Sequence, residues 1–351
     1  MSANQPYVLE VENLVVEADT AQGPVTLVDD VSFSVAPGEV LSLVGESGSG
    51  KSITMLAVMG LLPPGTWVAS GRIRFQGTDL LDLDERELNE LRGGRLAMVF
   101  QDPMTTLNPV RRVGSQLAEG VRLHDRSIGR AGSRRRVVQL LESVGIPDPA
   151  AKARDYPHQW SGGMRQRALI AGAMAHDPAL LIADEPTTAL DVTIQAQVMR
   201  VLAESRAASG SAMILITHDL GLVAQVADRV AVMYSGRIVE TQDVYRIFEG
   251  PQHPYTAGLL ASVLSLETAG AAAYAIPGQP PTPAGRGEGC PFQPRCEIGR
   301  DREECRTRPP LVGTAGGSLA CHFPLIDGAL PVGAPLPTIA RAALAPEVKA
   351  S

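Results

Sequence analysis

The sequence predicts an α/β fold with a small C-terminal domain that contains all of the cysteines. Three observations predict it. A glycine-rich loop at residues 45–52 lies between an apolar, strand-like run and a helical pattern. Two further apolar runs, at 179–183 and 212–217, end in polar residues, as strands buried on both faces do. All four cysteines lie in the last quarter of the 351 residues. Hydrophobic residues make up 44% of the chain, so it can bury a sizeable core.

Charge and hydropathy exclude several classes of protein. The chain carries 31 Lys and Arg against 38 Asp and Glu, a net charge of −7, which argues against a general nucleic-acid binder. No apolar stretch reaches the ~18–20 residues that a membrane-spanning helix needs. The N-terminus lacks the charged and apolar regions of a signal peptide. We therefore expect a cytoplasmic protein that neither spans a membrane nor is exported.

The N-terminal 91 residues read as strands followed by a first helix. Residues 7–16 alternate like a half-buried strand, residues 25–35 give a second strand, and the apolar run at 39–44 gives a third. After the glycine-rich loop, residues 53–59 have helical spacing and end at Gly60. Residues 72–75 alternate again, and the charged run at 80–91 is helical in spacing.

The glycine-rich loop has the pattern of a phosphate-binding site. Its residues are Gly45, Glu46, Ser47, Gly48, Ser49, Gly50, Lys51 and Ser52, which match G-x-x-x-x-G-K-[ST]. Glycines allow successive backbone N–H groups to point inward at an anion, and the helix that follows adds its unpaired N–H groups and positive dipole end. Lys51 can reach the β- and γ-phosphates, and the Ser52 hydroxyl suits Mg²⁺. The pattern indicates a nucleotide site.

The middle of the chain supplies a strand-end glutamine and a second anion-seeking helix start. The short apolar strand that begins at residue 96 runs to Gln101, whose amide suits Mg²⁺ and can orient an attacking water, although such a residue alone is a weak signal. Residues of about 103–175 read as a mostly helical insertion. Within it, Ser161 suits an N-cap, and Gly162 and Gly163 allow close approach to a phosphate.

Two more strands end in candidate catalytic residues. The run at 179–183 is followed by Asp184 and Glu185, and the run at 212–217 by His218. Ligands of α/β sheets gather at the carboxyl ends of strands. Asp184 suits a water-mediated contact with Mg²⁺, and Glu185 suits a general base for water. Taken alone, these residues could be solvated strand ends. Residues 230–234 and 237–240 read as a closing hairpin.

Together these motifs resemble the ATP-binding subunits of ABC transporters, in the branch that imports dipeptides, oligopeptides or nickel. The motifs follow one another in the order typical of the superfamily: the phosphate loop, Gln101, residues 161–163, residues 184–185, residues 189–191 and His218. Residues 99–104, 107–109, 161–167, 185–197, 253–256 and 276–278 carry the resemblance to the branch. It implies a P-loop ABC-type nucleotide-binding domain with a mixed core sheet, an antiparallel β subdomain and a helical subdomain at residues 1–250. A Cys-containing domain at 251–324 and a loose tail at 325–351 follow.

The resemblance also implies roles and partners. Two ATP-binding subunits would meet head to tail around two ATPs, so that Ser161 and Gly163 contact the γ-phosphate held by the partner subunit. Glu185 would be the base, His218 the γ-phosphate sensor and Asp191 part of the dimer contact; Ser52 and Gln101 would bind Mg²⁺. The branch favours a different chain as the second ATPase subunit. A pair of transmembrane permeases, contacted by the helical insertion, and an extracytoplasmic solute-binding protein complete the implied complex at the cytoplasmic face of the membrane.

This sequence departs from the family at two positions. The family has an aromatic residue before the second strand to stack on adenine, and the alignment places Ala18 there. Losing a base stack costs on the order of 1–3 kcal/mol, so we expect phosphate binding to be more secure than base binding. Trp160 stands where leucine is usual, and we expect it to change the packing beneath residues 161–163 while sparing their N–H groups.

The cysteines are Cys290, Cys296, Cys305 and Cys321. A cytoplasmic chain argues against two disulfides, and clustered thiolates there suggest a metal. The spacing contains no C-x-x-C pair, so a zinc-finger pattern is absent. The segment resembles the C-terminal motif of the importer branch, which implies a [4Fe–4S] cluster held by the four thiolates; zinc and unliganded thiols remain alternatives. His322 could be a ligand, but a position beside the ligands is favoured.

Three hypotheses of function follow. The first is a motor subunit that couples ATP binding and hydrolysis to the uptake of dipeptides or oligopeptides through a permease pair. The second is a soluble ABC ATPase with an iron–sulfur domain that acts on nucleic acid or ribosomes, although such proteins usually carry two cassettes and C-x-x-C clusters. The third, a non-hydrolysing subunit, is disfavoured by Glu185 and His218. The cargo and the identity of the second ATPase subunit stay open.

Overall fold

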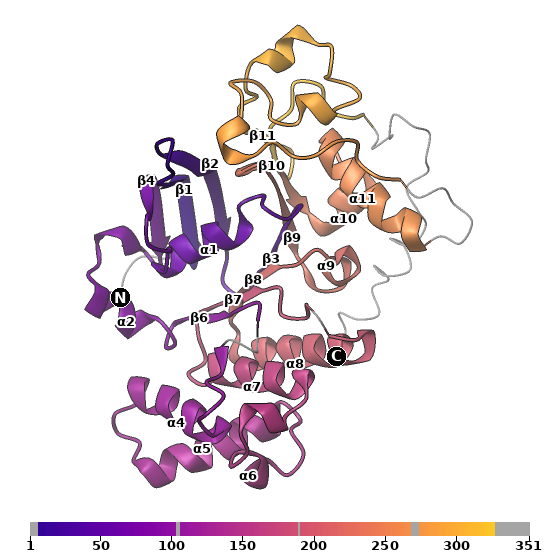
Figure 1. Cartoon of the computed structure of the whole chain (residues 1–351). Helices are drawn as coiled ribbons and strands as arrows, with labels where there is room; N and C mark the ends of the chain where they lie inside the picture. The colour runs from indigo at the N-terminus through magenta and orange to yellow at the C-terminus, as the bar shows by residue number, and fades with distance from the viewer. Residues whose placement is uncertain (1–5, 103–105, 189, 268–273, 327–351) are drawn as a thin grey trace. The chain divides into compact units, whose positions relative to one another are not determined.

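The computed structural model describes residues 6–102, 106–188, 190–267 and 274–326, coloured along the chain in Figure 1. The chain divides into two compact units. The helical unit comprises residues 1–9, 34–39 and 74–216. The phosphate-loop unit comprises residues 10–33, 40–73 and 217–351. The predicted tail at 325–351 lies outside the described residues from 327 onward.

Three neighbouring parallel strands of the larger sheet lie in the helical unit. They are β6 (Leu96–Val99), β7 (Leu180–Asp184) and β8 (Ala212–Ile216), with β7 in the middle. In the register, Leu180 pairs with Leu96 on one side and with Ala212 on the other. Every residue of β7 and β8 is buried, which explains why the sequence shows continuous apolar runs in place of alternation.

Helices make up most of the rest of this unit. They are η1 (Leu80–Asp82), α2 (Glu85–Leu91), α4 (Val113–His124), α5 (Arg130–Ser143), α6 (Pro149–Lys152), η2 (Pro157–Gln159), α7 (Gly162–Ala173) and α8 (Val192–Ser209). Figure 1 shows α4, α5, α6 and α7 gathered together. The apolar faces of α4, α5 and α7 meet in one cluster that includes Val121 and Leu141, together with Trp160 just before α7. The predicted helical insertion therefore has its own core, although residues 103–105 of its predicted range lie outside the described residues.

An antiparallel sheet lies largely in the phosphate-loop unit. Its order is β2 (Val25–Val35), β1 (Leu9–Ala18), β4 (Thr66–Phe75) and β5 (Thr78–Asp79). Burial alternates along most of β1 and β2, as the sequence predicts for half-buried strands. Gly71 has φ 103°, and a Cβ on it would lie 2.6 Å from the Cα of Leu14. The neighbouring strand therefore requires glycine at this position.

A mixed sheet forms the second layer of this unit. Its order is β11 (Val312–Thr314), β12 (Gly317–Leu319), β10 (Arg237–Asp243), β9 (Arg229–Tyr234) and β3 (Val40–Val44). Strand β3 is parallel to β9, and β9 is antiparallel to β10, so the predicted closing hairpin is present. The helices are α1 (Lys51–Met59), α9 (Leu220–Val226), α10 (Val244–Glu249) and α11 (Pro254–Glu267), with short turns η3 (Pro283–Gly285), η4 (Gln293–Arg295) and η5 (Glu303–Arg306).

The C-terminal segment shares a hydrophobic core with the rest of the phosphate-loop unit. Phe292 and Cys296 belong to the same buried cluster as Val44 of β3 and Tyr234 of β9. The sequence predicted a separate small domain stapled by metal because residues 251–324 are poor in core-forming side chains. The structure does not confirm that separate domain, since the segment packs its few apolar residues into a core formed mainly by others. The boundaries at 250 and 324 remain predictions.

The described residues include no helix that is both long and apolar enough to cross a membrane.

Glu240 fixes the start of the C-terminal segment onto β10. Its carboxylate is fully buried. Its Oε1 accepts hydrogen bonds from the backbone N–H of Gln252 at 2.7 Å and from the side chain of Gln242 at 2.6 Å, and its Oε2 accepts one from the N–H of His253 at 2.9 Å. Three donors satisfy this buried charge, as burial requires.

Replacing Glu240 by Gln should therefore destabilise the chain by about 3 kcal/mol, because the new amide group turns an N–H toward a donor and removes the charge that the other donors face. The midpoint of urea unfolding measures the loss. Glu249→Gln, on the exposed side of α10, is the control and should shift the free energy of unfolding by less than about 0.5 kcal/mol. Equal midpoints for both variants would show that residues 252–253 are fixed by other contacts.

Candidate functional site

The phosphate loop connects the end of β3 to the start of α1, as predicted. Gly45, Gly48 and Gly50 have φ angles of 149°, 76° and 105°, which only glycine adopts without strain. A Cβ on Gly45 would lie 2.1 Å from the carbonyl oxygen of Met233, so this glycine is also required by its neighbour. Ser47 and Gly48 are exposed at the tip of the loop. The backbone conformation matches the requirement for an anion-binding loop at a helix N-terminus.

Lys51 lies folded against the loop from which it projects. Its Nζ donates hydrogen bonds to the carbonyl oxygens of Gly45 at 2.8 Å and Glu46 at 2.9 Å, and to the hydroxyl of Ser49 at 3.2 Å. The side chain is 7% exposed. The ammonium is thus held at the loop, where a cation can bind a phosphate as a point charge. Ser52 follows in the first turn of α1.

Two residues outside the loop fix its backbone. The N–H of Glu46 donates to the Tyr255 hydroxyl at 2.9 Å, and the N–H of Gly236 donates to the carbonyl oxygen of Ser49 at 2.8 Å. The Glu46 carboxylate forms a two-point ion pair with Arg295, at 2.7 and 2.9 Å. Residues from β9–β10, α11 and η4 therefore converge on one side of the phosphate loop.

In the helical unit, the two carboxylates lie at the carboxyl end of β7. Asp184 is the last residue of the strand and is 5% exposed. Glu185 follows with φ 44°, a left-handed conformation that costs a non-glycine residue about 1–3 kcal/mol. Its N–H donates to the carbonyl oxygen of Ile216 at the end of β8, at 2.9 Å. Strain of this kind is concentrated at functional positions, which favours the predicted role of Glu185.

Gln101 and Glu185 are in direct contact, although 84 residues separate them. The Gln101 side-chain amide donates to Oε2 of Glu185 at 2.8 Å, and the Thr188 hydroxyl donates to the same oxygen at 2.7 Å. The two side chains predicted to orient water and to act as base thus meet at one sheet edge. The contact with Thr188 was not expected from the sequence; its place three residues after Glu185 was the only available signal.

Residues 161–163 begin α7, as predicted. The Ser161 side chain caps the helix by accepting a hydrogen bond from the N–H of Met164 at 3.3 Å. A Cβ on Gly163 would lie 2.3 Å from Cγ2 of Ile194 in α8, whereas one on Gly162 would lie 3.3 Å from a methyl group of Leu190. Packing against α8 is therefore a second reason for glycine at 163, besides close approach to a phosphate.

The remaining predicted positions have simpler surroundings. Asp191 caps α8 by accepting a hydrogen bond from the N–H of Ile194 at 3.0 Å; Ala189, in the same predicted contact loop, lies outside the described residues. His218 is exposed just after β8, in the phosphate-loop unit. Ala18 ends β1 and is half-buried. Trp160 is 2% exposed in the core of the helical unit, so it is a packing residue, as expected.

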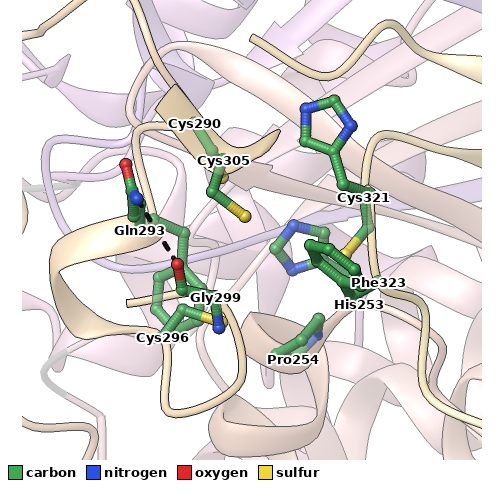
Figure 2. Close-up of a pocket in the computed structure, with 11 residues that line it drawn as sticks. His253, Pro254, Cys290, Gln293, Cys296, Gly299, Cys305, Cys321 and Phe323 are labelled. Atoms are coloured by element: carbon green, nitrogen blue, oxygen red, sulfur yellow. Dashed lines mark hydrogen bonds between the residues drawn. The ribbon is translucent and has the colours of Figure 1, made fainter. Parts of the chain in front are cut away.

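The four cysteines line one pocket, although 31 residues separate the first from the last. Figure 2 shows them around this space with His253 and Pro254. All four are free thiols. A Cβ on Gly299 would lie 2.8 Å from the sulfur of Cys305 and 3.4 Å from that of Cys296. We call this space the cysteine pocket. The fold, rather than the sequence spacing, brings these residues together.

Burial favours the protonated form of three of these thiols. It raises the pKa of Cys290 to about 11 and that of Cys321 to about 12, and it also raises the pKa of Cys305. At Cys290, hydrogen bonds from the backbone N–H groups of Phe292 and Gln293 oppose this effect. The N–H of Gly299 donates a hydrogen bond to the sulfur of Cys296 at 3.2 Å. Such N–H donors stabilise thiolates and cluster-bound sulfurs.

The two neighbouring histidines, His253 and His322, have ring nitrogens that already contact backbone groups. His253 is completely buried, which lowers its pKa to about 3, and its two ring nitrogens contact the N–H of Tyr255 and the carbonyl of Ala320. The Nε2 of His322 lies 3.1 Å from the carbonyl oxygen of Thr307. Within the described ranges, no group of three or more His, Cys, Asp or Glu side chains is arranged to hold a metal ion. The donors fit a four-thiolate site in number and type, but they do not form one in this side-chain arrangement.

Two residues of the C-terminal segment support the phosphate loop and were not predicted from the sequence. Arg295 and Tyr255 contact Glu46 across 249 and 209 residues. Both lie within motifs that were singled out for other reasons, the first cysteine pair and residues 253–256. No periodicity or spacing in the sequence connects either residue to residue 46.

Sequence profiles of two families match this chain. The family described as "ABC transporter" matches residues 28–188. The family described as "Oligopeptide/dipeptide transporter, C-terminal region" matches residues 239–305, which include the first three cysteines. The two matches together cover the phosphate loop, the carboxylates after β7 and most of the cysteine pocket.

Individual proteins are similar over most of the chain. The oligopeptide transport ATP-binding protein OppD of Salmonella typhimurium is 48% identical over 326 residues, which are 92% of this chain and 96% of that protein. OppD of Mycobacterium tuberculosis is 50% identical over 303 residues, and there the chain spans about half of the relative's length, 49%. Neither name refers to nucleic acid or ribosomes, so these relatives give no support to that alternative.

A solved structure shares the fold. The chain resembles the ATP-binding cassette MJ0796, solved as a dimer in a post-hydrolysis state with ADP and Pi, with a TM-score of 0.61 and 24% identity. The match covers 67% of this chain and 98% of that one. The predicted P-loop fold, with its mixed and antiparallel sheets, is confirmed.

Gly163→Ala should destabilise the helical unit by about 1–3 kcal/mol, because its Cβ would overlap Ile194 and α7 would have to shift from α8. Chemical denaturation of the nucleotide-free chain measures this. Adding Ile194→Ala should remove the overlap, so that the double variant is less destabilised than the two single effects predict when added.

Gly162→Ala is the matched control. Its Cβ would meet only the flexible end of Leu190, and alanine favours a helix, so stability should stay within about 0.5 kcal/mol of the wild type. If Gly163→Ala were equally harmless, packing against α8 would not be the constraint at this position.

Proposed function

The chain belongs to the ABC transporter family, in its oligopeptide and dipeptide branch, and on this premise we propose that it is an ATPase that drives peptide import. The phosphate loop carries the proposal, because its strand, glycine conformations and Lys51 form a complete support for a polyphosphate. The similarity to OppD over nearly its whole length supports a peptide cargo. Dipeptides and oligopeptides fit the matched family equally well.

We assign the chemical roles as follows. The N–H groups of residues 45–52 and Lys51 bind the phosphates, and Ser52, Gln101 and Asp184 bind Mg²⁺ directly or through water. Mg²⁺ neutralises charge on the phosphates when it is bound. Glu185 accepts a proton from the attacking water, which Gln101 orients. Hydrogen bonds from Gln101 and Thr188 hold the Glu185 carboxylate in one position, as a base that must meet a water requires.

His218, Ser161, Gly162, Gly163 and Asp191 complete the proposed site. His218 senses the γ-phosphate, and residues 161–163 and Asp191 act across a dimer of ATP-binding subunits. The N-capped start of α7 supports this role, because a helix N-terminus presents unpaired N–H groups to an anion. A contact that exists only while the γ-phosphate is present makes closure of the dimer depend on ATP and opening depend on hydrolysis.

We propose that the complex contains a second ATPase subunit of a different chain, two transmembrane permeases and an extracytoplasmic binding protein. The chain would then lie at the cytoplasmic face of the membrane, attached through the permeases. Reconstitution of the complex in liposomes, with labelled dipeptides and oligopeptides offered through the binding protein, tests both the import and the cargo. ATP-dependent uptake of neither peptide class would reject the proposed cargo.

We further propose that Cys290, Cys296, Cys305 and Cys321 hold a [4Fe–4S] cluster. Four free thiols in one pocket and N–H groups aimed at the sulfurs support it. A bound cluster would supply a covalent link between the turns that carry the four cysteines. Its role is therefore structural.

Glu185→Gln should leave ATP binding intact and reduce the rate of hydrolysis by about 10²–10⁴-fold, because the amide cannot accept the proton of water. Nucleotide binding and phosphate release are measured on the same preparation. Glu204→Gln, an exposed position of α8, is the control and should hydrolyse ATP at the wild-type rate. Undiminished turnover in Glu185→Gln would show that another group is the base.

Cys305→Ser should remove a brown chromophore with absorbance near ~400 nm from anaerobically purified protein, since a cluster of this kind requires all four thiolates. Iron, sulfide and zinc are quantified in the same samples. A colourless wild type that contains one zinc per chain would replace the cluster by a zinc site, and a wild type without metal would leave four structural thiols.

A further inference from the structure

The Glu46–Arg295 ion pair joins the phosphate loop to the cysteine pocket. Glu46 is the second residue of the phosphate loop, and Arg295 directly precedes Cys296. The guanidinium meets both carboxylate oxygens, at 2.7 and 2.9 Å, the geometry in which an arginine pair is strongest and most directional. The side chains are 5% and 26% exposed, so solvent screens the pair only partly.

Arg295 is itself fixed by several neighbours. Its Nε donates to the carbonyl oxygen of Pro277 at 2.9 Å, and its Nη1 lies 3.3 Å from the Tyr234 hydroxyl. Although burial opposes it, the hydrogen bonds to Glu46 and Tyr234 raise the pKa of Arg295 above the ordinary arginine value. The guanidinium is therefore a permanently charged group in a fixed position.

The turn that carries Arg295 begins in the cysteine pocket. Phe292 lies two residues after Cys290, lines the pocket and packs against Tyr234 and Tyr255, with ring centroids 5.3 and 5.4 Å apart. Tyr255 in turn accepts the hydrogen bond from the N–H of Glu46. Two chains of contacts thus connect the cysteine pocket to Glu46, one through the Arg295 guanidinium and one through the Tyr255 hydroxyl.

Glu46 connects this support to the phosphate-binding groups. Its carbonyl oxygen accepts a hydrogen bond from Lys51 Nζ at 2.9 Å and another from the N–H of Ser49 at 3.2 Å. The position of Glu46 therefore sets both the lysine and the turn of the loop. A glycine-rich loop has many accessible conformations. If only a fraction of the molecules has the loop in the conformation that binds phosphate, the measured affinity for nucleotide falls in proportion.

We propose that Arg295 is a positioning residue for the phosphate loop, through which the cysteine pocket supports ATP binding. The proposal rests on the proposed ATPase function. It makes the C-terminal segment part of the nucleotide-binding machinery, whether the cysteines hold a cluster, zinc or protons.

The test is a set of variants of the whole chain, measured by MgATP affinity and by the KM and kcat of hydrolysis. Arg295→Met keeps much of the side-chain volume and removes the hydrogen bonds, and should raise Kd and KM about tenfold with kcat changed by less than about twofold. Arg295→Lys keeps the charge and should recover part of the affinity. An unchanged KM in Arg295→Met would overturn the proposal.

The double variant Glu46→Gln with Arg295→Met separates positioning from the cost of an unpaired buried charge. It leaves no charge without a partner, so a merely structural role predicts recovery of both stability and affinity. Positioning predicts that thermal stability recovers while KM stays about tenfold raised, close to the value of Arg295→Met alone. Recovery of the wild-type KM would reject positioning.

Arg308→Met is the matched control. Arg308 lies in the same C-terminal segment and pairs with Asp29 of β2 at 2.6 Å, but it does not contact the phosphate loop in the described contacts. Its loss should leave KM unchanged. If Arg308→Met raised KM as much as Arg295→Met does, loss of any arginine ion pair in this segment would weaken binding. Arg295 would then have no specific role in positioning the loop.

Cys305→Ser tests the link to the pocket. In the wild-type background it should raise the Kd for MgATP, and in the Arg295→Met background it should add less than about twofold, because the connection is already broken. Equal effects in the two backgrounds would show that the pocket does not act through Arg295. A wild type that binds no MgATP would instead reject the proposed function, so the two failures are distinguishable.

Discussion

A phosphate-binding loop works only if its backbone N–H groups point inward before the anion arrives, and glycines alone cannot ensure this. In the phosphate-loop unit, Met233 permits no side chain at Gly45, Gly236 binds the Ser49 carbonyl, and Tyr255 binds the N–H of Glu46. These contacts come from strands and helices that follow the loop by about 190 residues or more. Only glycines can adopt, without strain, the backbone angles that the phosphate loop needs. Contacts with the rest of the unit then restrict the loop to that one conformation.

This constraint accounts for the way in which the C-terminal segment packs into the core of the phosphate-loop unit. Phe292 and Cys296 pack into the cluster that contains Val44 and Tyr234, so the segment forms a wall of the nucleotide-binding core. Glu240 fixes the beginning of the segment through two hydrogen bonds, from the N–H groups of Gln252 and His253, and Arg295 fixes a later turn onto Glu46. A group held by the four cysteines, as proposed, would strengthen the existing packing of the C-terminal segment against this core.

The helical unit holds Glu185, the proposed base, in a defined place. Glu185 has a left-handed backbone and a carboxylate that accepts hydrogen bonds from Gln101 and Thr188. Each feature restricts the position of the carboxylate. At Gly163, α8 leaves no room for a side chain, and the proposed contact of the start of α7 with an anion would be a second reason for glycine there.

Local chemistry was readable from the sequence. Local patterns predicted the phosphate loop between a strand and a helix, and Ser161 at the start of a helix. They also predicted Asp184 and Glu185 at the end of a buried strand. Each of these placements depends on residues within about ten positions of the site. The strand at 25–35 was predicted with its observed limits. The sequence also placed Trp160 in the core, since a large apolar side chain before a capped helix has few other places to go.

Contacts between distant residues were decided by the tertiary structure alone. The contact of Gln101 with Glu185, the single pocket around four cysteines with no C-x-x-C pair, and the support of Glu46 by Arg295 and Tyr255 all join segments far apart in the chain. The predicted separate domain was not confirmed, and the reason is similar. The composition of a segment shows only how many apolar residues that segment contains. Whether these residues are buried depends on the other segments that pack against it.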